Sequence, residues 1–366
     1  MTDKLYYSDQ YARECEAVVT KVDGTKLFLD RTIFYPEGGG APGDTGYFDG
    51  IRIVDTKKDS DDVVHILEKP TDAISVGKRG SLSLDWERRY HYMVMHTAQH
   101  LISALLFSTF GVHTVAIHLG EKYLTIESLE DIEEEKLFDI MDEANEKVLS
   151  SLSVYRMEMD RSSALSMHMR RSIKVEGDDV MVAVISGVDE VPCGGVHVKS
   201  TNEIGHVTYI GKEHIRGHLR TYWRVGDEDR KALRTGEKVL SLLSKALSST
   251  VEGLPDALDK KLARLSLLEG EVKALGEKGA FLEASLIKEG EVFHRTTFPS
   301  DKVASSLIDR GISGIFLLDD DSSFTFLGSG EEFSKLKAKG VKGGGRNGVY
   351  RGKCTLSEEE VKEALS

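Results

Sequence analysis

Residues 86–110 read WERRYHYMVMHTAQHLISALLFSTF, and this stretch decides how the rest of the chain is organised. Its apolar residues recur at helical spacing, which predicts a helix over Trp86–Phe110. Within it, His96 and His100 are four residues apart, so both imidazoles lie on one helix face with Cβ atoms about 6 Å apart. This pair suits two ligands of one cation. An isolated HxxxH motif is weak evidence for a metal, and by itself it favours a chance pair or two core histidines.

A second candidate half-site follows far along the chain, where residues 193–197 read CGGVH. Its two glycines permit a tight loop that folds Cys193 and His197 toward one point. A thiolate combined with imidazoles favours zinc over magnesium or calcium. The sequence therefore predicts one Zn²⁺ per chain, held by His96, His100, Cys193 and His197. Four protein ligands are typical of structural zinc, whereas catalytic zinc keeps an open position, and the spacing leaves both roles possible.

The overall composition excludes several classes of protein. A length of 366 residues predicts two or three domains. With 40% hydrophobic and 30% charged residues the chain is typical of soluble globular proteins. No apolar stretch approaches the roughly 20 residues of a membrane helix, and the polar start predicts no secretory leader. The three cysteines are far apart, which fits a cytoplasmic protein rather than a disulfide-rich secreted one.

Charge is segregated along the sequence. The net charge of −13 argues on average against a nucleic-acid partner. However, residues 127–146 hold ten acids and one lysine, whereas residues 335–353 hold seven basic residues and no acid. This C-terminal basic patch could contact phosphates, with a solvated basic face as the alternative.

We expect an α+β fold in four parts. Short strands separated by Asp-Gly and Gly clusters predict a small antiparallel barrel, and a second strand-rich unit surrounds the predicted helix. A segment with leucines near heptad spacing, interrupted at Glu269, predicts a helical hairpin or short coiled coil. The parts are a β-barrel-like glycine-loop domain (1–84), a zinc-containing α+β domain (85–226), the helical segment (227–290) and an α/β domain (291–366).

A glycine-rich loop at residues 34–46 reads FYPEGGGAPGDTG. Gly38, Gly40 and Gly43 fit a GxGxxG pattern, but Pro42 and the residues after it do not open a helix, so the dinucleotide-binding interpretation fails. A loop wall that lets a ligand approach the backbone closely is the better interpretation. A purely structural turn is the alternative.

Four motifs occur in a specific order: TIFYPEGGG (32–40) continuing to Gly46, DWERR (85–89), HTAQH (96–100), and CGGVHV (193–198) with EIG (203–205). In these motifs the chain resembles alanyl-tRNA editing proteins of the AlaX group and the editing domain of alanyl-tRNA synthetase. The helical segment and GGGRNG (343–348) resemble that synthetase's C-terminal domain. Together they look like the long AlaX form over nearly the whole chain.

The resemblance implies a free-standing, zinc-dependent aminoacyl-tRNA hydrolase that removes serine, or glycine, from mischarged tRNA(Ala). The resemblance also implies that zinc is bound by the two histidines of the helix together with Cys193 and His197. We take Thr32, His96 and His100 as candidate catalytic residues. Thr32 would form a hydrogen bond with the serine hydroxyl, so that alanine, which lacks this group, is not removed. The alternative is that Thr32 is only a β-branched residue that packs in a strand. Gly38, Gly39 and Gly40 would shape the substrate pocket.

Two positions depart from the family pattern. Ala41 stands where the family commonly has glutamine, and Val196 stands where its Cys-Gly-Gly-Thr-His motif has threonine. We expect zinc binding to survive both changes, and the pocket to be less polar.

The expected partner is mischarged tRNA(Ala). In the basic tail, Lys342, Arg346, Arg351 and Lys353 are the candidate tRNA contacts, and a second patch could form from Arg170, Arg171, Arg216, Arg220 and Arg224. The resemblance also implies a homodimer through the C-terminal region. Two rival functions are a zinc-stabilised tRNA-binding module without catalysis and an editor of another amino acid, such as the threonyl system.

Overall fold

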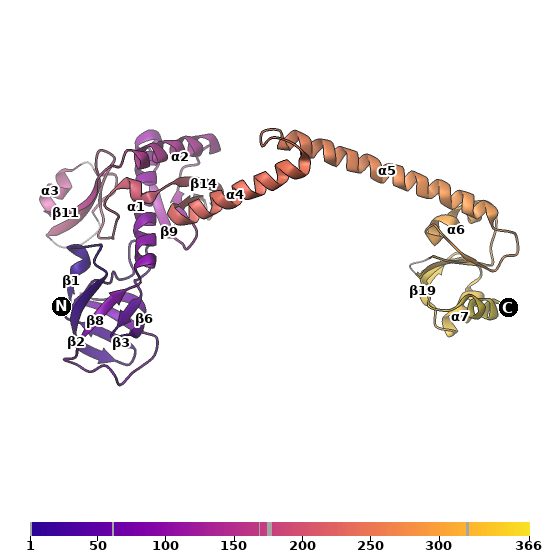
Figure 1. Ribbon diagram of the computed structural model, residues 1–366, viewed down its shortest axis with the longest axis horizontal. Helices are drawn as coiled ribbons and strands as arrows, with labels where there is room; N and C mark the ends of the chain where they lie inside the picture. Colours follow the sequence, from indigo (N-terminus) through magenta and orange to yellow (C-terminus); the bar gives the residue numbers. More distant parts are fainter. Residues whose placement is uncertain (1, 61, 168, 174–177, 320–321) are drawn as a thin grey trace. The chain divides into compact units, whose positions relative to one another are not determined.

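The computed structural model describes residues 2–60, 62–167, 169–173, 178–319 and 322–366. It divides into two compact units, Met1–Val239 and Leu240–Ser366. Helices and several sheets alternate along the chain, so the predicted α+β class is confirmed (Figure 1). Among the described residues, no helix is long and apolar enough to cross a membrane.

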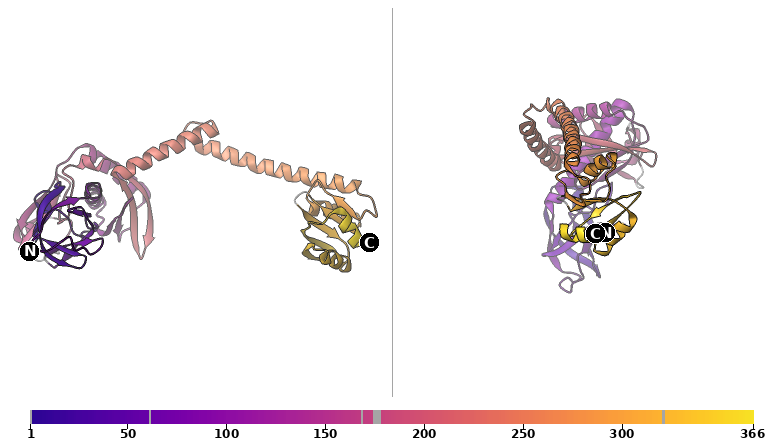
Figure 2. Two further views of the ribbon diagram at one scale, coloured as in Figure 1. Left: turned by 60° about the horizontal axis from the view of Figure 1, so that its bottom comes forward. Right: turned by 90° about the vertical axis from the view of Figure 1, so that its right-hand side faces the viewer.

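The first unit begins with a closed antiparallel barrel, seen in indigo in the left view of Figure 2. The strands follow around it in the order β2-β3-β7-β6-β5-β8, and tight turns join β2 to β3 and β5 to β6. Alternating residues of these strands, such as Leu27, Leu29 and Leu82, fill the interior. The strands are β2 (Glu14–Asp23), β3 (Lys26–Leu29), β5 (Gly46–Phe48), β6 (Ile51–Asp59), β7 (Asp62–Leu67) and β8 (Arg79–Leu84). A short parallel pair, β1 (Asp3–Lys4) with β4 (Arg31–Thr32), and the one-turn helix η1 (Leu5–Tyr7) complete this part.

Helix α1 (Trp86–Phe110) follows the barrel at the predicted bounds. Gly111 ends it in the left-handed conformation, with φ of 70°. Most of the helix is buried, because the helix packs on both α2 and a four-stranded antiparallel sheet in the order β14-β15-β10-β9. The neighbours are α2 (Glu134–Leu149), β9 (Thr114–Leu119), β10 (Leu124–Ser128), β14 (Val207–Ile215) and β15 (His218–Val225).

A three-stranded antiparallel sheet carries the second predicted half-site. It is built from β11 (Val154–Asp160), β12 (Asp179–Ile185) and β13 (Asp189–Pro192), with α3 (Arg161–Ser166) between the first two strands. Strand β13 ends at Pro192, so Cys193 starts the loop at the end of that strand. The short helix η2 (Thr201–Ile204) follows this loop.

In the described part of the second unit there are a five-stranded sheet and four complete helices, and α4 (Gly226–Leu247) crosses the boundary between the units. The sheet order is β16-β17-β18-β20-β19, with only the first pair parallel. Helix α5 (Leu254–Leu286) exposes its apolar stripe, including Leu262 and Leu265. The remaining elements are β16 (Phe293–Arg295), α6 (Ser300–Asp309), β17 (Ile315–Leu318), β18 (Ser323–Leu327), α7 (Gly330–Ala338), β19 (Lys342–Arg346), β20 (Val349–Lys353) and α8 (Glu358–Leu365).

Candidate metal centre

The structure brings the two predicted half-sites together. His96 and His100 extend from one buried face of α1, and Cys193 and His197 come from the loop after β13. The four potential ligand atoms lie within 4.8 Å of one another. Three of these side chains are buried and Cys193 is half-buried, so this cluster could hold a metal ion.

Two distances within the cluster fit a shared zinc ion. The Nε2 atoms of His96 and His197 each lie 3.6 Å from the Cys193 sulfur. Tetrahedral zinc, with bonds of about 2.3 Å to sulfur and about 2.0 Å to nitrogen, separates such ligand atoms by about 3.5 Å. The donor set of one sulfur and three nitrogens is also one that zinc accepts.

The electrostatics of the cluster favour an ionised thiol at Cys193 and neutral imidazoles at His96 and His197. Burial opposes ionisation of the Cys193 thiol, but His100 and His197 outweigh it and hold the pKa of Cys193 well below its ordinary value. Burial lowers the pKa of His197 to about 3, and burial followed by the neighbouring His100 lowers the pKa of His96. Burial opposes protonation of His100, but Cys193 and Asp189 outweigh it and raise the pKa of His100, so this imidazole would lose a proton on binding a metal.

Thr97 sets the tautomer of His197. Its hydroxyl donates to the Met93 carbonyl oxygen at 2.9 Å, so that its single proton is used. The Nδ1 atom of His197, 3.2 Å from the same oxygen, must therefore donate to it. This leaves Nε2, the nitrogen that faces Cys193, unprotonated and able to bind a metal.

Asp189 plays the corresponding part for His100. Its buried carboxylate accepts a hydrogen bond from His100 Nδ1 at 3.2 Å and two from the Arg170 guanidinium at 2.8 and 2.9 Å. Burial opposes ionisation of this carboxylate, but the His100 and Arg170 hydrogen bonds lower its pKa overall. A carboxylate behind a ligating imidazole orients the ring and raises its basicity. Asp189 was not among the residues predicted from the sequence, because no spacing rule links it to His100.

Glycines allow both loops to approach His96. A Cβ atom on Gly195 would lie 2.2 Å from His96 Cε1, a distance that no side chain tolerates. Gly39 has φ of 63°, and a Cβ there would lie 3.9 Å from the same ring atom. Gly38 and Gly40 belong to the same turn, which the bond between Gly38 N and the Ala41 carbonyl oxygen closes at 3.1 Å.

Arg89 of the DWERR motif holds the glycine loop against α1. Its buried guanidinium donates to the Asp44 carboxylate, to the Ile33 carbonyl oxygen and to the Gln10 carbonyl oxygen. Gln10 in turn accepts a hydrogen bond from the backbone N–H of His197 at 2.5 Å. One buried cation thus fixes the glycine loop relative to both half-sites.

A cavity of about 580 Å³ opens onto the cluster. His96, His100 and Cys193 line one side of it, and Gly39 of the glycine loop lines another. Its charged lining residues are Lys58, Glu158, Arg171 and Asp179. Of the proposed second arginine patch, Arg171 lines this cavity, whereas Arg170, Arg220 and Arg224 are each engaged with a carboxylate.

Thr32, on β4, is buried against His65 of the barrel strand β7 and does not line this cavity. His65 Nδ1 donates to the Leu27 carbonyl oxygen, so its Nε2 accepts the Thr32 hydroxyl proton at 2.8 Å. The Thr32 oxygen also accepts from the Phe34 N–H at 3.0 Å. The structure therefore does not bring Thr32 together with the cluster. Ala41 and Val196, the two departures from the family pattern, are buried in the core of the first unit.

The four candidate tRNA contacts lie on the two strands at one edge of the second unit's sheet. Lys342 and Arg346 are on β19, Arg351 and Lys353 are on β20, and Lys342 pairs with Lys353. The β19 residues are exposed. The Lys353 ammonium donates to the Ser323 hydroxyl at 2.7 Å.

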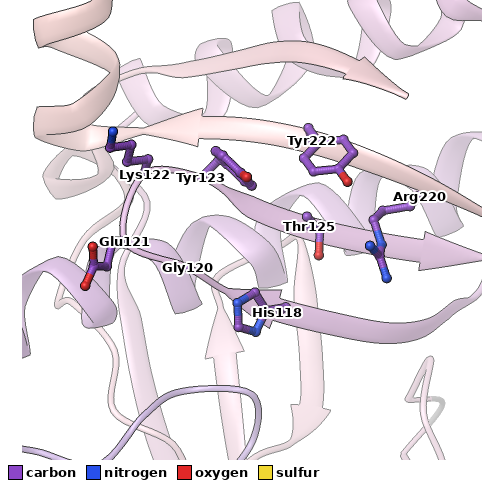
Figure 3. A pocket seen from close by; sticks show the side chains of 8 residues that line it. All are labelled: His118, Gly120, Glu121, Lys122, Tyr123, Thr125, Arg220 and Tyr222. Carbon is purple, nitrogen blue, oxygen red and sulfur yellow. The ribbon is translucent and has the colours of Figure 1, made fainter. Parts of the chain in front are cut away.

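A separate hollow of about 470 Å³ lies over β9, β10 and β15 (Figure 3). His118, Tyr123 and Tyr222 line it, together with Arg220. The guanidinium of Arg220 is bound to the Glu127 carboxylate at 2.6 Å, which neutralises its charge. None of the site residues that we expected to bind metal or substrate lines this hollow.

Known proteins resemble this chain throughout. An alanyl-tRNA editing protein AlaX-L from Pyrococcus horikoshii is 28% identical over 99% of this chain and 96% of its own length. The resemblance to the long-form AlaX proteins is confirmed. Class II (A) tRNA synthetases match residues 5–88, which contain the barrel.

Alanine–tRNA ligases are similar over part of their length. The ligase of Methanococcus aeolicus is 27% identical over the whole of this chain, which spans 42% of that ligase. The ligase of Saccharolobus islandicus is 35% identical over 72% of this chain and 30% of the ligase. The chain thus corresponds to less than half of these ligases, and to nearly all of AlaX-L.

Proposed function

We propose that this protein is a trans-acting aminoacyl-tRNA deacylase that removes serine, or glycine, from mischarged tRNA(Ala). The observation that carries the proposal is the four-residue cluster at the wall of a cavity, in a chain similar over its full length to an alanyl-tRNA editing protein. The reaction is hydrolysis. A bond forms between the water oxygen and the ester carbon, the ester bond to the terminal ribose oxygen breaks, and that oxygen receives a proton.

The proposed cofactor is one Zn²⁺ per chain, held by His96, His100, Cys193 and His197. The proximity and burial of these side chains support zinc, as do the low pKa values of the Cys193 thiol and the His197 imidazole. When bound, zinc can polarise an ester carbonyl or lower the pKa of a water. Thr97 and Asp189 would hold two of the imidazoles in the orientation that binding needs.

The chain's own residues would place the ester beside the cluster. Gly39 has no side chain to obstruct the approach of an aminoacyl group to His96. Lys58 and Arg171 would contact the phosphodiester of the terminal nucleotide, although Glu158 and Asp179 balance their charge in the lining of the cavity. Gly38 and Gly40 would maintain the turn that presents Gly39.

Selection of serine over alanine is proposed to depend on Thr32, as the resemblance implies. In this structure the Thr32 proton is used by His65. For Thr32 to recognise a substrate hydroxyl, its own hydroxyl would have to leave His65 and form a hydrogen bond with the substrate. A hydroxyl-selective site rejects an analogue that lacks the group because its own polar atom is then left unpaired.

The second unit is proposed to hold the tRNA and to pair two protomers. Lys342, Arg346, Arg351 and Lys353 supply a cluster of positive charge on adjacent strands, and the exposed leucines of α5 supply an apolar stripe suited to a helix partner. The division into four parts at residues 84, 226 and 290 belongs to the same proposal.

Loss of a metal ligand distinguishes this proposed function from its main alternative. A closed set of four protein ligands is also typical of structural zinc, so the rival is a tRNA-binding module without catalysis. We expect Cys193→Ala to lose stoichiometric zinc and deacylation of seryl-tRNA(Ala) while the tRNA still binds. Cys354→Ala, at a buried cysteine of the second unit, is the matched control. Full zinc content in Cys193→Ala would overturn the ligand assignment. Wild-type protein that binds tRNA without deacylating it would favour the binding module.

A further inference from the structure

Tyr7 is a large aromatic side chain that remains open to solvent at the cavity. Of the three tyrosines that line the cavity, Tyr6 and Tyr35 are buried, whereas Tyr7 is 42% exposed. The same side chain also lines a neighbouring hollow of about 440 Å³. The Tyr7 ring therefore stands between the cavity at the metal cluster and a second, shallower space.

The ring is held rigidly by its neighbours. Tyr6 packs against Tyr7 with ring centroids 4.7 Å apart, and Tyr35 packs edge-on against Tyr6 at 5.5 Å. The guanidinium carbon of Arg156 lies 5.4 Å from the Tyr7 ring centroid. A cation over a ring in this way stabilises the arrangement. Tyr7 thus gains support from the protein while part of its surface is left uncovered.

Arg156 also ties Tyr7 to the metal loop. Its guanidinium donates to the carbonyl oxygens of Tyr6 and Tyr7 at 2.8 and 2.9 Å, and to the carbonyl oxygen of Gly195 at 2.9 Å. Gly195 lies against His96 and is two residues from Cys193. The position of the Tyr7 ring is therefore fixed relative to the cluster by one side chain.

We propose that Tyr7 is the stacking platform for the terminal nucleobase of the aminoacylated RNA. Unpaired bases at RNA ends are recognised by stacking on aromatic side chains. The cavity volume of about 580 Å³ has room for a nucleoside beyond the small aminoacyl group. The second hollow, which Tyr7 lines together with Lys4 and Asp3, would hold the preceding nucleotide.

The charges around Tyr7 provide no net attraction for an RNA backbone. Lys58 and Arg171 line the cavity with Glu158 and Asp179, and Lys4 lines the hollow with Asp3. These charges balance, so they neither repel the backbone strongly nor bind it tightly. Stacking is then the main contribution that this face offers to the last nucleotide. The inference rests on the proposed function, since it names how the same site holds its substrate.

The test is binding of an acceptor-stem RNA minihelix of tRNA(Ala) that carries serine through a non-hydrolysable amide. Full-length wild type, Tyr7→Phe and Tyr7→Ala are compared, each with its zinc content measured. Tyr47→Ala is the matched control, because Tyr47 is 40% exposed on β5 with the Arg52 guanidinium 4.9 Å from its ring, and it does not line the cavity. A second minihelix lacks the terminal adenosine.

We expect Tyr7→Ala to bind the complete minihelix roughly 5- to 150-fold more weakly than wild type. Tyr7→Phe and Tyr47→Ala should bind it as wild type does, and all four proteins should bind the shortened minihelix equally. Equal affinity of wild type and Tyr7→Ala for the complete minihelix would overturn the inference, as would an equal loss for both minihelices. Failure of wild type to deacylate seryl-tRNA(Ala) would instead overturn the proposed function, and the two failures are measured separately.

Discussion

At the scale of single residues, Asp189 is predicted to support zinc binding by orienting His100. Its carboxylate bridges His100 and Arg170. Asp189→Asn keeps the shape of the side chain but weakens the hydrogen bond that orients His100. We expect zinc affinity, measured by competition with a chelator, to fall by about 10- to 100-fold. Glu190→Gln, at the exposed neighbour on β13, should leave it unchanged. Equal affinities in the two variants would contradict the positioning role.

Thr32 gives a prediction about selectivity. In Thr32→Val the hydroxyl is removed, so His65 Nε2 and the Phe34 N–H are left without their partner, at a cost of about 1–3 kcal/mol in stability. If Thr32 governs the reading of serine, the ratio of seryl- to alanyl-tRNA(Ala) deacylation should fall roughly tenfold. Thr32→Ser, which retains the hydroxyl, should keep the ratio. If the ratio is unchanged in Thr32→Val, Thr32 does not contribute to selectivity and serves only in packing.

His65 predicts how stability depends on pH. Burial lowers its pKa to about 4 in the folded protein, whereas the unfolded chain has a pKa of about 6.5. The unfolded state therefore binds the proton first, and stability falls as pH drops from about 6.5 towards 4. At about pH 5 the loss is about 2 kcal/mol. The unfolding free energies of wild type and His65→Gln would be measured at about pH 7.5 and about pH 5. Between these pH values the unfolding free energy of the wild type should fall by about 2 kcal/mol more than that of His65→Gln. Equal losses would contradict a neutral buried imidazole.

At the scale of elements, the loop after β13 contains two adjacent glycines, of which Gly195 is predicted to matter for zinc binding and Gly194 is the control. Gly195→Ala would place a Cβ atom 2.2 Å from the His96 ring, so the ligand must shift. Gly194→Ala meets only the Tyr7 hydroxyl, at 3.6 Å. We expect Gly195→Ala to lower zinc affinity at least about 10-fold, as loss of ligand orientation does, and Gly194→Ala to change it little. Equal zinc affinity of the two variants would show that the loop has room to adapt.

Periodicity predicted the regular elements well and their contacts poorly. Helix α1 was predicted at its observed bounds because its helical pattern is uninterrupted and Gly111 ends it. Strand β11 was missed because its exposed residues alternate with only half-buried ones, which hides a strand from a hydrophobicity pattern. The mixed α+β class was predicted correctly.

The site was predicted only where its residues share a local motif. The two half-sites each have recognisable spacing, and the fold brings them together. Asp189 and Arg156 act through contacts with distant segments, and no spacing reveals such contacts. The buried bond between Thr32 and His65 depends on strand order in the barrel, which the sequence pattern does not give.

For the whole molecule, the basic strand pair of the second unit predicts a salt effect. Neutralising Lys342, Arg346, Arg351 and Lys353 to glutamine should weaken tRNA binding. It should also flatten the dependence of log K on log salt by about 0.9 for each phosphate that the variant no longer neutralises. Neutralising the exposed α5 residues Lys260, Lys261, Arg264 and Lys273 is the matched control. Equal salt slopes in the two variants would show that β19 and β20 do not contact phosphates.

Deacylation itself tests the central claim most directly. Purified full-length protein would be given seryl-, glycyl- and alanyl-tRNA(Ala), first as isolated, then after chelation, and again after zinc is restored. We predict fast release of serine with alanine spared, loss of the activity on chelation and its return with zinc. Tight, salt-sensitive tRNA binding with no release of serine in any of these states would contradict the proposed deacylase.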